Sequence, residues 1–493
     1  MNAKNIHVIG AGLGGLAISC LLASDGHRVT VFEKNDSPGG KINQVIADGF
    51  RFDTGPSLMT MPFVLKELFE RCGFRAEDYI NLKPVEPICR YFYQDGTVFT
   101  SYQDLDNTLD ELSQLAPVDV DNYIKFLDYS SNLYQRTKDA FLFNPLYGLK
   151  DLGNLNLLDF FRIDAFHTVS DRVDEYFKSP YLRKFFKRFT TYNGSSPYQA
   201  PATLNVIPYV ELSMGGYYVD GGMYAIVTAL HRLAMDLGVE FRFNSDIKRI
   251  KVLNKQVESV IDSEGEKHTA DLVVSNSDAA ETYLELLGED AVSESKKENI
   301  ENLEPSCSGF VLLLGINRRY EQLRHHNIFF SEDYELEFQK IFREKVMPED
   351  PTIYIANTSA SNPEHAIEGG SNLFVLVNAP YLSENYNWDE HSEAYASFII
   401  SELEKRGLEN LSSSIVHQSH ITPADFREKY RSNRGSIYGT SSNSRFAAFL
   451  RPRNKSREVK GLYLTGGSTH PGGGIPLVIL SAFHAMELIR RYE

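Results

Sequence analysis

The sequence predicts an α/β protein whose two ends meet in one domain. Near the N-terminus, an apolar strand, Ile6–Ile9, leads through a glycine-rich turn into a helix, Leu16–Ser24. A second strand, Val29–Phe32, follows, and this order of elements is a βαβ unit. Near the C-terminus, the last expected strand, Gly461–Thr465, runs into a second glycine cluster and a closing helix, Pro476–Tyr492. We therefore expect a Rossmann-like domain that both ends of the chain complete.

The first glycine-rich turn has the spacing that binds a dinucleotide. Gly10 permits the tight turn, Gly12 lets a pyrophosphate approach the backbone, and Gly15 lets the helix pack on the strand. Gly14 belongs to the same turn. Glu33 follows the second strand, where its carboxylate can bind both hydroxyl groups of an adenosine ribose and would repel a 2′-phosphate. The turn therefore predicts a dinucleotide site that disfavours NADP.

The length of the chain predicts more than one domain, because 493 residues exceed one ordinary core. Two later strands, Val239–Phe243 and Ala270–Val274, are expected to return to the first sheet, and Phe310–Ile316 reads as a buried strand. Residues 60–200 carry charged and aromatic segments that predict helices. We expect a discontinuous cofactor domain at residues 1–75, 202–300 and 425–493, and a membrane-facing substrate domain of mixed sheet and helices at residues 76–201 and 301–424.

Composition excludes several classes of protein. The net charge of −16 argues against nucleic acid as a partner, because its phosphates would be repelled. The four cysteines have no CxxC spacing and no ligand cluster stands out, so neither a metal site nor a disulfide scaffold is expected. No apolar run approaches the roughly 20 residues of a spanning helix, and no signal peptide is visible. We expect a cytoplasmic protein.

A glycine pair soon after the second strand indicates which dinucleotide is bound. Gly39-Gly40-Lys41 and the later Phe52–Ser57 segment resemble the large flavoprotein superfamily of amine oxidases and carotenoid desaturases. No second GxGxxG with an acidic partner occurs, so no separate NAD(P)H site is expected. The resemblance implies FAD, held by Gly10, Gly12, Gly14, Gly15, Glu33, Lys34, Gly39, Gly40, Lys41, Gly55, Pro56, Ser57, Leu58, Ile247, Gly466, Gly467, Gly474, Ile475 and Pro476.

The C-terminal glycine cluster suits the flavin end of that cofactor. Gly474-Ile475-Pro476 opens the closing helix with proline in its first turn, where a missing N–H costs nothing. The N-terminus of a helix carries roughly half a positive charge, which would stabilise the negative charge of a reduced flavin. Glycines also let a flat ring lie against the backbone. The alternative is a loop and helix without a ligand, which the glycines of Pro471–Pro476 disfavour.

The segment Gly461–Ser481 resembles the signature of bacterial-type phytoene desaturases, which are FAD-dependent carotenoid desaturases. Gly473 and Leu477 depart from the commonest residues of that signature and are more similar to 3,4-desaturases of 1-hydroxycarotenoids. The resemblance implies an amine-oxidase-like architecture and oxidation of a C–C single bond in an acyclic or monocyclic carotenoid. A phytoene- or diapophytoene-type desaturase and a redox-neutral carotenoid isomerase are alternatives. An amine oxidase and a non-enzymatic prenyl-binding protein of the same fold are more distant ones.

No catalytic constellation stands out, so no catalytic residue is assigned. In this chemistry the cofactor carries the difficult step and the protein mainly positions the substrate. Segments that resemble the family contain four candidate bases, and for each of them a structural hydrogen bond or a surface position is the favoured explanation: Glu211, Glu368, His325 and His470.

A carotenoid does not dissolve in water, so we expect access from a bilayer and peripheral membrane association. Within Tyr181–Phe189, one helical face carries Leu182, Phe185, Phe186 and Phe189, and basic residues occupy the rest. Such a helix suits a membrane surface. A stripe that packs into the core is an equally good explanation. The expected electron acceptor is oxygen or a membrane quinone, and no oligomeric state is predicted.

Overall fold

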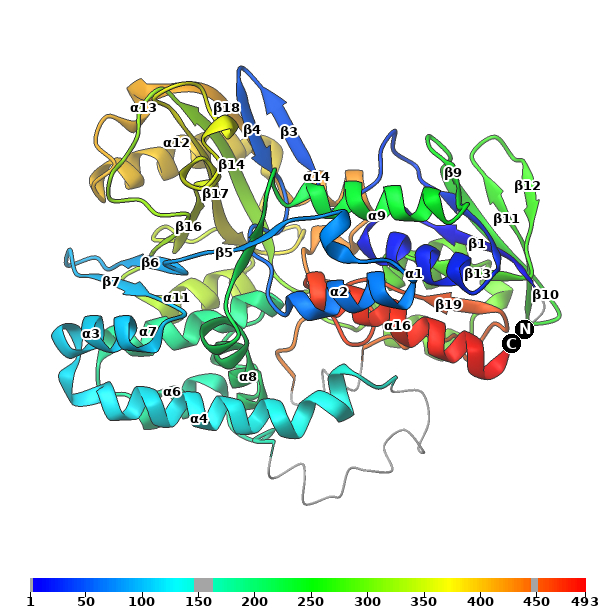
Figure 1. The fold of residues 1–493 in the computed structure, drawn as a ribbon, viewed down its shortest axis with the longest axis horizontal. Coiled ribbons are helices and arrows are strands. Elements are labelled where there is room, and N and C mark those ends of the chain that lie inside the picture. Colours follow the sequence, from blue (N-terminus) through cyan, green and yellow to red (C-terminus); the bar gives the residue numbers. More distant parts are fainter. Residues whose placement is uncertain (1–2, 146–162, 445–450) are drawn as a thin grey trace.

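The computed structural model describes residues 3–145, 163–444 and 451–493. A five-stranded parallel sheet forms the half of the molecule on the right in Figure 1, where both termini lie. Val8 lies opposite both Val31 and Val274 in this sheet. The expected return of two later strands to the first sheet is confirmed. The strands are, in spatial order, β19 (Leu462–Leu464), β13 (Leu272–Ser275), β1 (Asn5–Ile9), β2 (Arg28–Phe32) and β9 (Glu240–Arg242).

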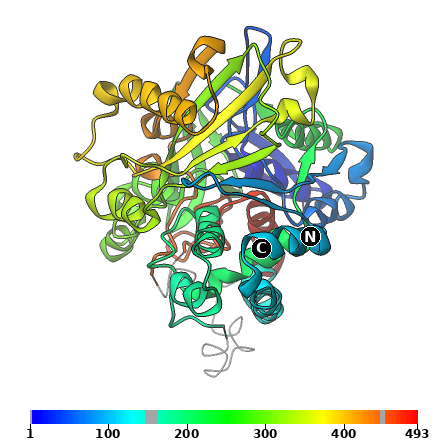
Figure 2. The same cartoon turned by 90° about the vertical axis from the view of Figure 1, so that its left-hand side faces the viewer.

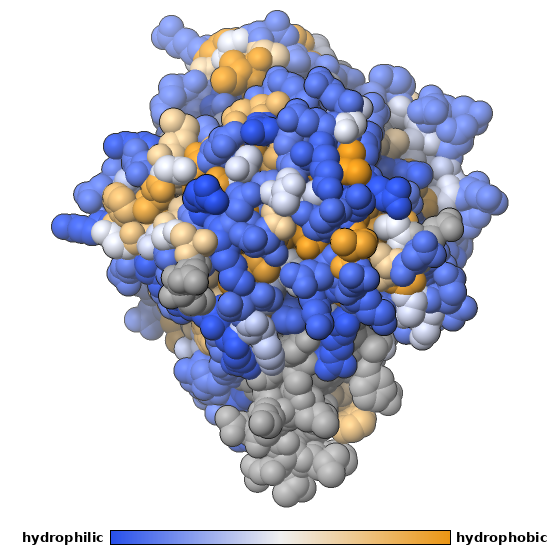
Figure 3. All heavy atoms as spheres, turned by 90° about the vertical axis from the view of Figure 1, so that its right-hand side faces the viewer, coloured by the Kyte–Doolittle hydropathy of each residue, from blue (hydrophilic) through white to orange (hydrophobic). Residues whose placement is uncertain are grey.

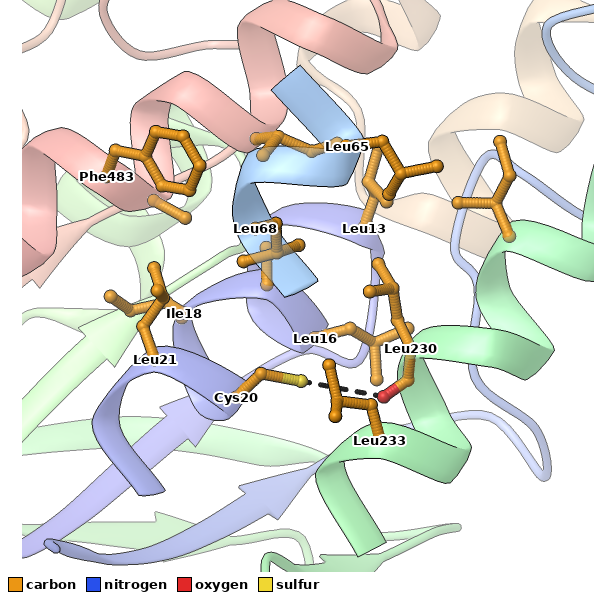
Figure 4. Packing of buried hydrophobic residues seen from close by; sticks show 14 of the residues in the cluster. Leu13, Leu16, Ile18, Cys20, Leu21, Leu65, Leu68, Leu230, Leu233 and Phe483 are labelled. Carbon is orange, nitrogen blue, oxygen red and sulfur yellow. Dashed lines mark hydrogen bonds between the residues drawn. The ribbon is translucent and has the colours of Figure 1, made fainter. Parts of the chain in front are cut away.

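Apolar helices pack on this sheet and on one another. Figure 4 shows Leu16 and Ile18 of the first helix among leucines from two other helices and Phe483 from the last. The first helix begins at Leu13 rather than at the expected Leu16, because Gly12 is its N-cap residue and the glycines after it adopt helical geometry. These helices are α1 (Leu13–Ser24), α2 (Pro62–Arg71), α9 (Tyr224–Asp236) and α16 (Ile475–Tyr492).

A second, seven-stranded sheet forms the other half of the molecule (Figures 1 and 2). Its neighbouring strands are antiparallel except β15 and β6. The strands are, in spatial order, β18 (Ile415–Ile421), β14 (Ser308–Ile316), β17 (Ser371–Ala379), β16 (Ile353–Ala356), β15 (His326–Phe329), β6 (Cys89–Phe92) and β7 (Val98–Ser101). Strands β6 and β7 fall in the region 60–200, which was expected to be rich in helices, and no strand was singled out there; the alternating burial of Cys89–Phe92 is the period of a strand.

The two faces of the second sheet meet different partners, because successive side chains of a strand point to opposite faces. Phe310 of β14 stacks on Trp388 at the start of α12 (Trp388–Lys405), with ring centroids 5.6 Å apart. Val311, the next residue, packs instead with Phe50 and Phe52 of the hairpin β3 (Gln44–Ala47) and β4 (Phe50–Asp53). This hairpin side of the sheet also faces the cavity described below.

Helices beneath the second sheet form an aromatic core with it. They are α3 (Leu105–Leu115), α4 (Val120–Thr137), α6 (Val169–Tyr176) and α7 (Pro180–Lys187). The apolar stripe of α7 lies wholly in this core: Phe185 and Phe186 are 0 % exposed, and Phe185 contacts Tyr91 and Phe99 edge-on. The interpretation of this face as a membrane-docking surface is therefore wrong. The stripe finds aromatic partners from distant strands and helices.

The remaining elements complete the two halves. A three-stranded antiparallel sheet consists of β10 (Ile247–Leu253), β11 (Gln256–Asp262) and β12 (Lys267–Thr269), and β5 (Leu82–Pro84) pairs with β8 (Tyr217–Val219). Within the described ranges, the other α-helices are α8 (Val206–Pro208), α10 (Glu294–Glu301), α11 (Tyr334–Gln339), α13 (Leu411–Ser414) and α14 (Pro423–Tyr430). The face beside the termini is mainly hydrophilic, with scattered apolar residues (Figure 3). Among the described residues, no helix is long and apolar enough to cross a membrane.

Candidate cofactor and substrate site

One cavity of about 620 Å³ brings the two glycine clusters together. Every residue predicted to hold the cofactor lines this cavity, with the exception of Gly15. Gly15 lies behind the lining: a Cβ there would be 2.0 Å from the carbonyl oxygen of Gly10, so only glycine lets α1 pack this closely on the turn. The chain ends and the segment 39–58 therefore meet at one site, as the sequence predicts.

The N-terminus of α1 forms one end of the site. Gly12, its N-cap residue, provides no side-chain cap, so the first amide groups of the helix are free of side-chain acceptors. A Cβ on Gly14 would lie 2.5 Å from Asn276 Oδ1 and 3.0 Å from the amide nitrogen of Gly466. This bare backbone, at the positive end of a helix, fits a pyrophosphate.

Glu33 lies at the carboxyl end of β2 and is 5 % exposed. Its Oε2 accepts a hydrogen bond from the Ala11 amide at 2.7 Å, and its Oε1 accepts one from the Asn35 amide at 2.9 Å. These bonds hold the carboxylate in the cavity wall, where it fits a ribose. The neighbouring Lys34 donates to the backbone carbonyl of Glu428, and Ile247 lines the same end.

Lys41 joins the first part of the chain to the last. Its Nζ donates to the backbone carbonyls of Ser436 and Ile437 at 3.0 and 2.9 Å. Burial lowers the pKa of Lys41 to about 8, and Asp278 acts in the opposite direction. Burial disfavours the charged form of Asp278 too, and for a carboxyl group this raises the pKa. Both side chains line the cavity, so its wall carries a basic and an acidic group in a poorly solvated setting.

The second glycine cluster forms the other end of the cofactor half. Gly474 is the N-cap residue of α16 and provides no side-chain cap, so a second helix N-terminus opens on the cavity. Arg451, which the sequence did not single out, also lines the cavity and is 6 % exposed. Burial lowers its pKa to about 10, and no carboxylate is hydrogen-bonded to it among the described residues. Bare backbone, two helix N-termini and a buried cation fit an anionic dinucleotide with a flat ring.

The candidate bases lie in different settings. Glu211 lines the cavity, and so does His470, whose ring stacks on His484 and whose pKa burial lowers to about 4. His325 is buried behind the lining, where its Nδ1 is 2.6 Å from Ser361 Oγ. Glu368 is exposed in the turn before β17, away from the cavity. The structure therefore assigns no catalytic base.

Beyond the cofactor half, the cavity wall becomes largely apolar. The hairpin-side face of the second sheet and the segment around α8 provide much of this part of the wall, and residues next to α2, α4 and α6 provide the rest. Its apolar residues are Met61, Ile88, Phe141, Leu142, Ile163, Leu204, Val206, Ile207, Val210, Val311, Ile328, Phe374 and Leu376. The arrangement can hold a long hydrocarbon next to the cofactor half.

A polar cluster interrupts this apolar wall. Arg188 forms a buried ion pair with Glu211 and donates to Tyr91 Oη at 2.6 Å. Glu211 also accepts a hydrogen bond from the phenol of Tyr192. On the neighbouring strands, Tyr354 Oη is 2.5 Å from Ser57 Oγ and 2.7 Å from His326 Nδ1.

Sequence reasoning missed several of these residues. Asn276 and Asp278 follow an expected strand directly, and polar residues at the carboxyl end of a parallel strand are a usable signal for a site. The partners of Arg188 and Tyr354 come from distant segments, and no local pattern reveals them.

The comparisons with known proteins agree with the geometry of the fold and the cavity. Together they show that the protein is an FAD-dependent oxidoreductase. The chain belongs to the family of flavin-containing amine oxidoreductases, whose model matches residues 13–489. The expectations of FAD, of an amine-oxidase-like fold and of an enzyme are therefore confirmed. The individual cofactor contacts remain predictions.

Two curated relatives match over almost the whole chain. A 4,4′-diapolycopene oxygenase of Methylomonas sp is 38% identical over 484 residues, which cover 97% of this chain and 96% of the relative. A 4,4′-diaponeurosporene oxygenase of Staphylococcus aureus (strain MSSA476) is 36% identical over 497 residues, or 99% of each chain. Membership of the carotenoid desaturase family is thus supported.

Solved structures share the fold at low sequence identity. An oxidoreductase from Methanosarcina mazei aligns with a TM-score of 0.67 and 17% identity over 98% of this chain and 99% of its own. Putrescine oxidase aligns with a TM-score of 0.62 and 13% identity over 99% of each chain. A Rab GDI from Plasmodium falciparum aligns with a TM-score of 0.56 and 12% identity over 98% of each chain. These likenesses concern the fold alone.

Proposed function

We propose that the protein oxidises an end group of an acyclic carotenoid and that FAD takes up the electrons. The observation that carries this proposal is the continuity of the cavity, which runs from the glycine clusters into an apolar chamber on the second sheet. An apolar chamber favours a hydrocarbon, because burial removes its surface from water. The names of the two curated relatives, which are oxygenases of diapocarotenoids, support the same class of substrate.

The proposed conversion turns a terminal methyl group into an aldehyde. The carbon gains one oxygen and loses two hydrogens in a four-electron oxidation, which FAD can accept in two rounds of two electrons. If water supplies the oxygen atom, four protons go to solvent and the electrons pass from FAD to oxygen or a quinone. If molecular oxygen supplies it, one O₂ is consumed and one water is released.

A second candidate function is 3,4-desaturation of a 1-hydroxycarotenoid. The two departures in the C-terminal signature, Gly473 and Leu477, favour it, and both residues line the cavity. A Cβ on Gly473 would lie 3.2 Å from atoms of Tyr438, so alanine there would press on the tyrosine that lines the cavity beside it. The glycine would thus widen the space for an oxygenated end group. A phytoene- or diapophytoene-type desaturase would need no such space.

Product masses separate these candidates. The FAD-loaded protein would be incubated with 4,4′-diaponeurosporene and, separately, with an acyclic 1-hydroxycarotenoid, in detergent micelles under air. The proposed function predicts that the first compound gains one oxygen and loses two hydrogens. A product of the second compound that has lost two hydrogens without gaining oxygen, with the first compound unchanged, would establish the desaturase instead.

We propose further that the protein takes its substrate from a bilayer, because a carotenoid hydrocarbon has no appreciable solubility in water. The face of α7 that carries Phe185 does not serve this contact, since it is buried. Flotation of the unmodified protein with liposomes tests the association: recovery in the lipid fraction is expected, and recovery only in the aqueous fraction would contradict it.

A further inference from the structure

Two tyrosines, Tyr192 and Tyr354, line the cavity, and the phenol oxygen of each is hydrogen-bonded to the protein. Each ring is half-buried, and both rings line the cavity. They come from different segments, the turn after α7 and strand β16. Tyr354 lies close enough to Tyr192 to contribute to the raised pKa of that phenol.

Tyr192 is held by a buried ion pair. Its phenol donates a hydrogen bond to Glu211, and Glu211 in turn pairs with Arg188. The side chains of Arg188 and Glu211 are 7% and 2% exposed. A carboxylate has no hydrogen to give, so Tyr192 must be the donor. Among the described residues no second hydrogen bond reaches its phenol, so the oxygen can accept one from a ligand.

Tyr354 is held from two sides. Ser57 Oγ and His326 Nδ1 lie 2.5 and 2.7 Å from its phenol oxygen. Ser57 belongs to the segment that follows Gly55, and a Cβ on Gly55 would be 2.0 Å from the carbonyl oxygen of Lys41. This contact fixes Tyr354 at the border between the apolar wall and the cofactor half of the cavity.

Both rings keep their hydroxyl proton. Burial raises the pKa of Tyr192 well above its usual range, and the charge of Glu211 adds to this effect. Burial also raises the pKa of Tyr354. Burial lowers the pKa of His326 well below its usual range, with smaller contributions from His325 and Arg188, so this imidazole is neutral. The cluster therefore presents neutral phenols to the cavity.

We propose that the phenol oxygens of Tyr192 and Tyr354 form a hydroxyl-binding subsite, which holds the terminal alcohol of a partly oxidised hydrocarbon chain. This proposal rests on the proposed function: the first round of two electrons turns the methyl group into an alcohol, and the second turns the alcohol into the aldehyde. The subsite binds and does no chemistry. Because Tyr192 offers lone pairs, it favours an alcohol, which can donate a hydrogen bond, over an aldehyde, which cannot. The intermediate is retained and the final product is released.

The test compares variants that lose only a hydroxyl group, Tyr192→Phe and Tyr354→Phe. Their matched control is Tyr93→Phe: Tyr93 is buried in the same aromatic core and donates to the carbonyl of Tyr181 at 2.9 Å, but it does not line the cavity. The holoprotein would be given 4,4′-diaponeurosporene and its terminal alcohol, and kcat/KM would be measured for both.

Each cavity variant should lower the ratio of kcat/KM for the alcohol to kcat/KM for the hydrocarbon by about 3- to 10-fold, the value of one hydrogen bond. The control should leave this ratio within about twofold of wild type. An unchanged ratio in both cavity variants, or the same fall in the control, would overturn the subsite.

Failure of the proposed function has a different signature. If the wild-type holoprotein converts neither compound, the proposed function fails, and the subsite is then tested by binding alone. Dissociation constants for the terminal alcohol and the terminal aldehyde would be measured from the shift of the carotenoid absorption band. The subsite predicts tighter binding of the alcohol to wild type and loss of this preference in Tyr192→Phe. Equal binding of the two compounds to wild type would overturn it.

Discussion

Gly14 and Gly466 lie against each other where the two glycine clusters meet. A Cβ on Gly14 would be 3.0 Å from the amide nitrogen of Gly466 and 2.5 Å from Asn276 Oδ1. Asn276 also lies 3.4 Å from Thr465 Oγ1, so its side chain links the end of β13 to the end of β19. Residues from the two ends of the chain thus depend on each other for the geometry of one site.

This contact predicts that Gly14→Ala weakens FAD binding. Overpacking costs about 1–3 kcal/mol, which corresponds to roughly 5- to 150-fold in the dissociation constant. Titration of the apoprotein, followed by flavin fluorescence, measures it. A dissociation constant within about twofold of wild type, with the fold intact by circular dichroism, would mean that the two clusters do not share a ligand.

Glu33→Ala should also weaken FAD binding, for a different reason. The variant removes the buried carboxylate and leaves the amide of Ala11 without its acceptor. An unsatisfied buried group costs about 1–3 kcal/mol, again roughly 5- to 150-fold in affinity. Asp36→Ala is the matched control, because Asp36 lies in the same loop but is exposed and does not line the cavity. Equal affinities of the two variants for FAD would exclude the proposed ribose contact.

Breaking the buried ion pair of Arg188 and Glu211 should cost more stability than breaking an exposed ion pair. Arg188→Met leaves the Glu211 carboxylate buried without its cation and should lower the free energy of unfolding by about 3–5 kcal/mol. Lys66→Met, which breaks an ion pair with side chains 46% and 53% exposed, should cost at most about 1 kcal/mol. Urea denaturation of both variants measures the difference. Similar losses of unfolding free energy in the two variants would show that burial does not make this ion pair more important for stability.

The burial of α7 changes the expected outcome of substitutions in its apolar stripe. Phe185→Ala should lower the free energy of unfolding by about 3–5 kcal/mol, because it opens a cavity among Tyr91, Phe99 and Phe189. Val118→Ala, at a residue 68% exposed, should change it by less than about 0.5 kcal/mol. Thermal or chemical denaturation checks both. Loss of liposome binding in Phe185→Ala, with unchanged stability, would restore the docking interpretation.

Buried histidines should make the fold sensitive to acid. Burial lowers the pKa of His484 to about 3, with a further contribution from His470, and its Nε2 donates to the carbonyl of Leu142 at 2.9 Å. Between pH 6.5 and about 3 the unfolded chain binds a proton at this residue that the folded chain does not, so stability falls as the pH falls. The fall is about 1.4 kcal/mol per pH unit, or of the order of 5 kcal/mol across the whole window.

His484→Gln keeps a hydrogen-bond donor and removes the titration. It should therefore flatten the decline of the urea midpoint between pH 6.5 and 4.5. His391→Gln, at an exposed histidine, is the matched control and should give the same decline as wild type. Parallel curves for His484→Gln and wild type would contradict this origin of acid sensitivity.

Local sequence patterns predicted the cofactor half of the molecule well. The strand, turn and helix around Gly12 and the acid at Glu33 lie close together in the chain, and their spacing alone carries the geometry. The helix that follows the second glycine cluster was predicted equally well, because Gly474 and Pro476 mark its start.

The substrate half could not be predicted in the same way. The stripe that contains Phe185 has the same pattern whether a membrane or a protein core covers it, and only the tertiary fold brings Tyr91 and Phe99 to it. Likewise, the pairing of Ser57 with Tyr354 joins residues far apart in the sequence, so no local pattern indicates it.

Direct transfer of electrons from a carotenoid end group to FAD is the central claim, and anaerobic mixing tests it most directly. The FAD-loaded protein would be mixed with the terminal alcohol of 4,4′-diaponeurosporene in the absence of oxygen, and the flavin absorption band would be followed. The account predicts that the band bleaches and that one aldehyde forms for each flavin reduced. A flavin that stays oxidised while the alcohol remains unchanged would contradict it.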